Sequence, residues 1–169
     1  MQDVIKVDYS IPGCPPIPSM IKNILTALLE GRNPEHPTKN LCSECEKTHE
    51  SMLIPTKEFL AFQVVAPHQV DYKEDICFLE QGILCIGFAT RAGCEGRCVN
   101  SNLPCRGCMG PLEKEVDQGC AAISGLASIF PIGHLIQEED LAGTVYRYSL
   151  PYSILHRLYK IKGEENKNE

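Results

Sequence analysis

Residues 94–111 read CEGRCVNSNLPCRGCMGP, and this stretch decides how the chain folds. It places four thiols within 15 residues, in the pattern Cys94-x3-Cys98-x6-Cys105-x2-Cys108. Four thiolates can surround one zinc ion or one iron–sulfur cluster. Glycines in and just before the stretch let backbone N–H groups approach cluster sulfurs closely. These are Gly93, Gly96, Gly107 and Gly110. We therefore expect loops folded around a metal centre.

A second set of four thiols comes earlier in the chain. Cys42-x2-Cys45 is followed by Cys77 and Cys85, which together supply four more ligands. Spacing alone leaves the grouping open, because Cys77 could serve the later site and Cys94 the earlier one.

Cysteine is the outlier of the composition, with 10 among 169 residues. Trp is absent while Gly (13) and Pro (12) are frequent, so the core is modest and needs cross-links. Disulfides require an oxidising compartment, and no secretory leader is visible. The spacing favours iron–sulfur clusters first, zinc second and disulfides last. Arginines among the cysteines would offset cluster charge, unless they are simply solvated. They are Arg91, Arg97 and Arg106.

Two cysteines stand outside both sets. Cys120 lies on the apolar face of an expected helix, and we interpret it as a buried small hydrophobe. Cys14 lies in a Pro-Gly-Cys-Pro-Pro turn before an expected helix, where a helix N-terminus favours thiolate. Cys14 would be a single ligand, without three further ligands to complete a four-ligand site.

The remaining pattern predicts a strand, a turn and a helix over residues 4–31, with Ser19 as the helix cap and Gly31 after its end. Further elements are expected as a strand at 57–65, a short helix at 75–83, loops at 86–111, a helix at 113–130, and a short strand and helix within 145–161. The five histidines fall in no repeated ligand spacing, and we interpret them as structural or exposed. No phosphate-binding loop and no nucleophile with its base is apparent.

Charge and hydropathy exclude some classes of function. A net charge of −6 argues against nucleic acid as the main partner. The apolar stretches are shorter than a membrane helix needs, so we expect no membrane insertion. Without a visible leader, a cytoplasmic location is expected.

Longer strings of residues resemble a known family. The Cys14 turn resembles the proximal-cluster motif of nickel–iron hydrogenase small subunits and of a related subunit of respiratory complex I. Four other strings look like the small (gamma) subunit of cytosolic group 3 hydrogenases, of the archaeal viologen-reducing or deazaflavin-reducing type. They are Cys42-Ser-Glu-Cys45, Cys77-Phe-Leu-Glu-Gln-Gly-Ile-Leu-Cys85, Ala92-Gly93-Cys94-x3-Cys98 and Pro104-Cys105-Arg106-Gly107-Cys108-Met109-Gly110-Pro111.

The resemblance implies a ligand set for each cluster. A distal 4Fe–4S cluster would be held by Cys42, Cys45, Cys77 and Cys85. A medial 4Fe–4S cluster would be held by Cys94, Cys98, Cys105 and Cys108. Cys14 would be the last ligand of a proximal cluster shared with a partner chain.

The resemblance also implies a domain that is not seen here. Family members usually begin with a flavodoxin-like domain, which holds the other proximal ligands. The fold expected is α+β. Residues 1–31 would be the last strand and helix of a flavodoxin-like α/β domain completed by a partner chain. Residues 32–160 would form a loop-rich iron–sulfur domain, and 161–169 a flexible tail. A lost proximal cluster and a truncated reading frame are the alternatives.

Together these observations predict an electron-transfer subunit of a soluble hydrogenase complex that is not catalytic on its own. Its partners would be a catalytic subunit, the chain supplying the flavodoxin-like domain, and a downstream flavin or iron–sulfur acceptor subunit. The alternatives are a ferredoxin-like carrier in another oxidoreductase complex, of the iron-only hydrogenase or heterodisulfide reductase type, and a structural zinc protein.

Overall fold

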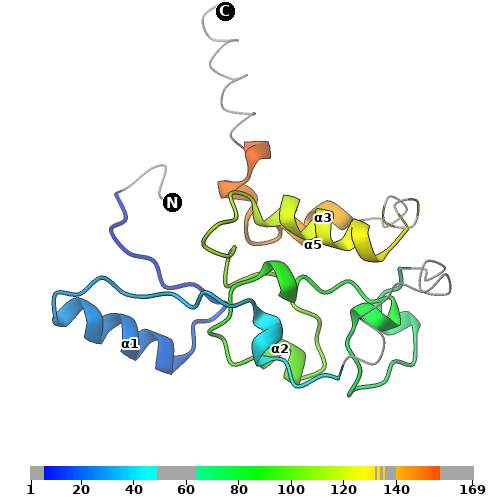
Figure 1. Ribbon diagram of the computed structural model, residues 1–169, viewed down its shortest axis with the longest axis horizontal. Coiled ribbons are helices and arrows are strands. Elements are labelled where there is room, and N and C mark those ends of the chain that lie inside the picture. The colour runs from blue at the N-terminus through cyan, green and yellow to red at the C-terminus, as the bar shows by residue number, and fades with distance from the viewer. Residues whose placement is uncertain (1–5, 49–63, 132, 134, 136–139, 157–169) are drawn as a thin grey trace, which may run out of the picture.

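The computed structural model describes residues 6–48, 64–131, 133, 135 and 140–156, and it consists of short helices joined by long loops (Figure 1). The α-helices are α1 (Pro18–Leu29), α2 (Arg97–Asn100), α3 (Gln118–Ile129) and α5 (Leu141–Tyr146). The 3-10 turns are η1 (Leu41–Glu44), η3 (Pro67–Gln69), η4 (Leu79–Gln81), η5 (Gly87–Ala89) and η6 (Leu150–Tyr152). Within these residues extended pairing is limited to isolated bridges, at Asn40–Arg91, Thr48–Ile76 and Val65–Ile83.

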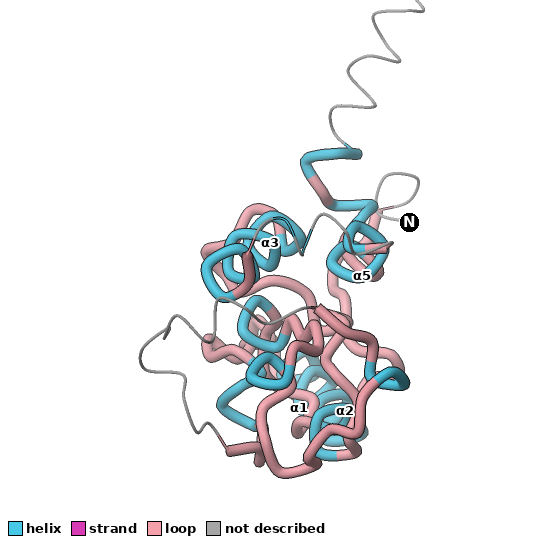
Figure 2. The backbone as a smooth tube through the Cα atoms, turned by 90° about the vertical axis from the view of Figure 1, so that its right-hand side faces the viewer, coloured by secondary structure: helices cyan, strands magenta, loops and turns pink. Residues whose placement is uncertain are grey.

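The main core is built from the loops that carry cysteines and from α3 and α5. Phe78, Ile83 and Ile86 are fully buried and pack in one cluster with Leu126 of α3 and Val145 of α5. Helices α3 and α5 lie side by side in both views (Figures 1 and 2). The cluster also contains cysteine side chains, so the core of this protein and its candidate metal centre are one structure.

Helix α3 can pack closely because two of its residues have no side chain. A Cβ added at Gly125 would lie 2.2 Å from the Phe88 ring, and one added at Gly119 would lie 2.3 Å from the Tyr146 ring. Asp117 caps the helix by accepting a hydrogen bond from the Cys120 backbone N–H at 2.8 Å. Glycine at these contacts lets the aromatic rings lie directly on the helix backbone.

Helix α1 forms a second, smaller core. Its buried Met20 and Ile24 pack on Met109, and Cys94 and Cys108 border the same cluster. The helix therefore covers one side of the later cysteines, while Leu29 on its other side is 89% exposed. Its end follows the expected pattern, since Gly31 adopts a φ of +69° after the last turn.

Several expected elements differ in the structure. The α1 cap is Ile17, without a side-chain hydrogen bond, rather than Ser19, because Pro18 occupies the first helical position. The helix expected over 113–130 begins only at Gln118, where Asp117 supplies the cap. Residues 75–83 hold the 3-10 turn η4, and a Gly82 φ of +80° ends it.

The expected strands are not found where the structure is described. Residues 6–11 are not in a strand, and residues 4 and 5 lie outside the described part. Residues 145–156 contain only helical turns, so the strand expected there is wrong for them. A lone strand cannot form a ladder, and the described residues offer these segments no partner strand. Of the strand expected at 57–65, only 64 and 65 are described, and Val65 bridges Ile83. The α+β class, the flavodoxin-like unit and the domain boundaries remain predictions.

In the part of the chain that the structure describes, no helix has the length and apolar character needed to cross a bilayer.

Candidate metal centre

One group of thiols lines a cavity with apolar walls, and we call it the first thiol group. It consists of Cys42, Cys45, Cys77 and Cys85. Leu41, Phe78 and Val99 form much of the wall. At the edge of the group a Cβ added to Gly87 would lie 3.7 Å from the sulfurs of both Cys42 and Cys85. Glycine at this position therefore keeps the space beside these two sulfurs open.

Another group, the second thiol group, lines a separate cavity. It consists of Cys94, Cys98, Cys105 and Cys108, and Cys14 lines the same cavity. Cys105 is buried, whereas Cys98 and Cys14 are exposed. The structure thus places Cys77 with the earlier cysteines and Cys94 with the later ones. Which of them bind a metal remains a prediction.

Backbone N–H groups donate hydrogen bonds to sulfurs in both groups. The sulfur of Cys85 accepts from the backbone of Cys105 at 3.3 Å and also from that of Gly87. Cys77 accepts from the backbone of Leu79 and Glu80. In the second group, Cys94 accepts from Gly96 and Arg97, Cys105 from Gly107, and Cys108 from Cys14. Such N–H···S bonds stabilise thiolates and tune the potential of iron–sulfur clusters.

Burial shifts the pKa values of these thiols upward. It raises the pKa of Cys42 to about 12, with nearby thiols adding to the effect. Burial likewise raises the pKa of Cys85 to about 11 and that of Cys105 to about 12, although backbone hydrogen bonds partly offset it. A bound metal cation reverses this balance, because a coordinating thiol is deprotonated outright. Without a cation these thiols are held in the neutral form, and binding a cationic centre would require their deprotonation.

A hydrogen bond joins the two groups directly. Cys105 belongs to the second group, and its backbone N–H donates to the sulfur of Cys85 in the first. Gly87 lies at the same point, since its added Cβ would also come within 3.7 Å of the Cys105 Cβ. The cavities are thus neighbours within one core.

The number of thiols in each cavity limits the kind of centre that it could hold. Four thiolates are the ligand set of a structural zinc ion and of a 4Fe–4S cluster alike. Among the described residues, no three His, Cys, Asp or Glu side chains meet closely enough to hold a single metal ion.

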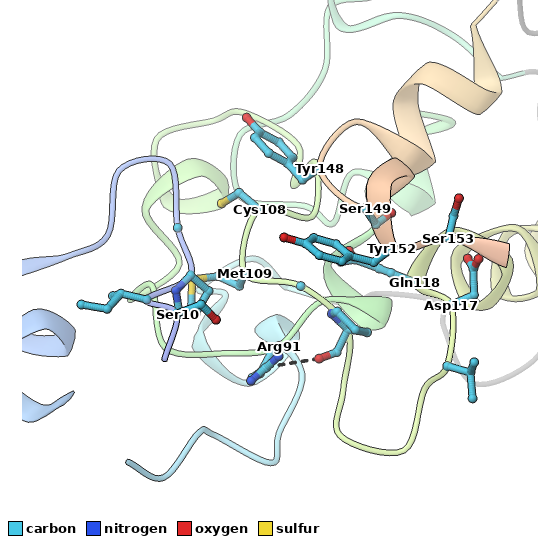
Figure 3. Close-up of a pocket in the computed structure, with 16 residues that line it drawn as sticks. Ser10, Arg91, Cys108, Met109, Asp117, Gln118, Tyr148, Ser149, Tyr152 and Ser153 are labelled. Carbon is cyan, nitrogen blue, oxygen red and sulfur yellow. Dashed lines mark hydrogen bonds between the residues drawn. The ribbon is translucent and has the colours of Figure 1, made fainter. Parts of the chain in front are cut away.

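A surface cleft of about 370 Å³ opens beside the second group (Figure 3). Cys108 and Tyr148 lie along one side, and Arg91 lies beneath with its Nε donating to the Pro111 carbonyl at 3.1 Å. A hydrogen bond from Tyr148 to Cys14 raises the pKa of the tyrosine. The cleft brings solvent-exposed surface close to this thiol group.

The comparisons with known proteins point to one family. The chain is 38% identical over 160 residues to the vhu G subunit of the F420-non-reducing hydrogenase of Methanocaldococcus jannaschii, covering 95% of this chain and 52% of that protein. It is 37% identical over 92 residues to the corresponding G subunit of Methanothermus fervidus, covering 49% of this chain and 72% of that protein. The chain belongs to the family of G subunits of F420-non-reducing hydrogenases.

The name of another relative states the class of its cofactor. The iron-sulfur G subunit of the F420-non-reducing hydrogenase of Archaeoglobus profundus is 32% identical over 167 residues, covering 93% of this chain and 51% of that protein. The chain spans about half the length of most of the G subunits it matches. No family model matches it. Membership confirms the hydrogenase part of the resemblance, while the group 3 assignment remains a prediction.

One cysteine is placed differently from the expectation. The sequence predicts a buried hydrophobe at Cys120, but this residue is exposed, and its sulfur lies 3.3 Å from the Tyr146 hydroxyl. The apolar face of α3 is formed instead by Ala122 and Leu126, which are fully buried. Helical spacing puts Cys120 near that face, but the contact with α5 decides which side is covered.

The charge beside the first group is not apparent from the sequence. Lys47 is 7% exposed, lines that cavity and lies 4.5 Å from the centre of the Phe78 ring. Its Nζ donates to Asn102 Oδ1 at 2.9 Å and to the Glu74 carbonyl. Of the arginines, Arg106 lines the second cavity, whereas Arg91 lines the surface cleft.

Two more polar residues support the thiols, and the sequence does not reveal them either. Thr90 is fully buried and hydrogen-bonded to Cys105, and Glu44 contacts the loop around Cys94. Their partners are distant in sequence, so no local motif marks them. His36 is exposed, and His49 and His134 lie outside the described residues.

Proposed function

We propose that this chain relays electrons within a hydrogenase complex, through one 4Fe–4S cluster in each thiol group. The observation that carries the proposal is the pair of adjacent four-thiol cavities, joined by the hydrogen bond from the Cys105 N–H to the Cys85 sulfur. Membership of the G-subunit family supports the hydrogenase context. The first group would hold the distal cluster and the second the medial cluster.

The clusters would supply the one-electron redox chemistry, and the protein's own residues would set its conditions. Cysteine sulfurs would bind iron. Backbone N–H groups donating to those sulfurs would stabilise the reduced state, and the apolar wall of Leu41, Phe78 and Val99 would keep water from the first site. Within this proposal the chain is not catalytic on its own, and hydrogen is split on another subunit.

Cys14 marks the side from which electrons would arrive. It is exposed, borders the second cavity and donates its backbone N–H to the Cys108 sulfur. We propose that it is a ligand of a proximal cluster completed by a flavodoxin-like domain, of which residues 1–31 would be part. The catalytic subunit would lie beyond it, and a flavin or iron–sulfur acceptor subunit would lie near the first group. Within this proposal the complex is of the cytoplasmic group 3 type.

The test is iron and acid-labile sulfide per chain, with electron paramagnetic resonance of the reduced sample, after anaerobic purification with whatever binds to it. About eight irons per chain are expected for two four-iron clusters, and about twelve if a bound partner completes a third. Stoichiometric zinc in a colourless protein would overturn the proposal in favour of a structural zinc protein. Eight irons with a partner other than a nickel-containing subunit would favour the ferredoxin-like carrier.

Cysteine variants sharpen this test. Cys105→Ser should lose or convert one cluster, because its sulfur is buried within the second cavity. Cys120→Ser is the matched control, since it makes the same substitution in the same chain outside both cavities. Equal iron loss in both variants would show that the thiol groups are not the binding sites.

A further inference from the structure

Glu44 lies inside the Cys42-Ser-Glu-Cys45 motif, yet its side chain reaches the other thiol group. Its Oε1 accepts a hydrogen bond from the Gly93 N–H at 2.7 Å, and its Oε2 accepts one from the Gly96 N–H at 3.3 Å. These two glycines flank Cys94. One carboxylate thus holds the loop of the second group from within the motif of the first.

Asn100 of α2 strengthens the same contact from the other direction. Its Nδ2 donates to the Glu44 carbonyl at 3.2 Å, and its Oδ1 accepts from the Glu46 N–H at 3.1 Å. The two backbones come so close that a Cβ at Gly96 would lie 2.5 Å from the Glu44 carbonyl oxygen. Gly96 also has a φ of +61°, which favours glycine. The junction is therefore specific and closely packed.

The carboxylate lies against the backbone of the second thiol group, because both of its oxygens accept hydrogen bonds from the loop around Cys94. Its negative charge is thereby held beside that group. The Gly96 N–H donates both to Glu44 and to the Cys94 sulfur, so the carboxylate competes for a hydrogen bond that would stabilise added negative charge. Negative charge and a shared donor both disfavour reduction of a cluster at this position.

We propose that Glu44 is a positioning residue that joins the two thiol groups and lowers the reduction potential of the cluster in the second group. This inference rests on the proposed function. Each cluster accepts one electron on reduction and returns it on oxidation, and the electrons come from and go to the neighbouring subunits. The carboxylate itself is neither oxidised nor reduced. It changes only how the electron is distributed between the two clusters.

The test is a redox titration followed by electron paramagnetic resonance, on the complex purified anaerobically, with wild type, Glu44→Gln, Glu44→Asp and Glu46→Gln. Glu46 is exposed and two residues away, so Glu46→Gln removes the same charge without touching the Gly93 loop. The second-group signal is identified as the one altered by Cys98→Ser. Glu44→Gln should raise the potential of that signal alone, whereas Glu44→Asp should keep it near wild type because the charge remains.

The inference would be overturned by no shift in Glu44→Gln, by an equal shift of both signals, or by the same shift in Glu46→Gln. Equal shifts in Glu44→Asp and Glu44→Gln would also overturn it, because the charge would not be the cause. If Glu44→Gln loses iron, the test rests on Glu44→Asp instead. The iron content and the reduction potential of Glu44→Asp should both stay near those of the wild type. Wild-type protein without iron would instead refute the proposed function.

Discussion

Thr90→Val tests whether a buried hydroxyl ties α3 to the thiol groups. Thr90 is fully buried, and its hydroxyl donates to the Ile86 carbonyl at 2.6 Å and accepts from Gln118 Nε2 at 3.1 Å. Valine has nearly the same shape, so the substitution leaves no cavity. The Ile86 carbonyl keeps a second donor in the Ala89 N–H. The loss therefore falls on Gln118 and on Cys105, to which the Thr90 side chain is also hydrogen-bonded.

Gln118 is 2% exposed, and after the substitution its Nε2 keeps, among the described residues, the hydrogen bond to the Gly107 carbonyl at 3.1 Å. One buried amide proton without an acceptor costs about 1–3 kcal/mol. With a urea dependence of about 2 kcal/mol per M, the midpoint of unfolding should fall by about 1 M. The assay is an anaerobic urea titration followed by circular dichroism and by visible absorption.

The double variant Thr90→Val with Gln118→Leu separates the lost partner from other effects. The Gly107 carbonyl keeps the Gly110 N–H at 3.0 Å, so this carbonyl stays paired when Gln118 is replaced. Replacing both partners with apolar groups can be nearly neutral, so the double variant should recover much of the lost stability. A double variant at or below the stability of Thr90→Val would refute the reasoning, as would a single variant equal to wild type.

Three further predictions concern α3 and the thiols. Gly125→Ala should destabilise the fold by about 1–3 kcal/mol in thermal unfolding, because the added Cβ would lie 2.2 Å from the Phe88 ring. By metal analysis, Cys120→Ala should leave the iron content intact, whereas Cys105→Ala should remove about half of it. Asp117→Ala should cost about 0.5–2 kcal/mol through loss of the helix cap. Burial opposes ionisation of Asp117, but backbone hydrogen bonds outweigh it and hold the pKa of this carboxyl below its usual value. The wild-type advantage should therefore be full above about pH 4 and shrink as the pH falls through the folded pKa, which circular dichroism across that range checks.

Local patterns predicted the parts of this protein that depend on neighbours in the chain. The spacing of Cys94, Cys98, Cys105 and Cys108 predicted a loop-rich segment around a shared cavity, because short separations force thiols together. The helix ending before Gly31 followed from a residue that tolerates a positive φ. The strand expected at the N-terminus was not found over residues 6–11, because strand formation depends on a partner that a local pattern cannot supply.

The amino-acid sequence alone supplies the thiols, the glycines that let backbone approach them, and little other core material. How the thiols divide depends on the packing of distant loops, which places Cys77 in one cavity and Cys94 in the other. That packing also decided that Cys120 faces outward, and that Glu44 bridges to a loop 49 residues away. The physical reason is range: spacing constrains residues within a few turns of chain, whereas burial and long-range hydrogen bonds exist only once distant loops have packed together.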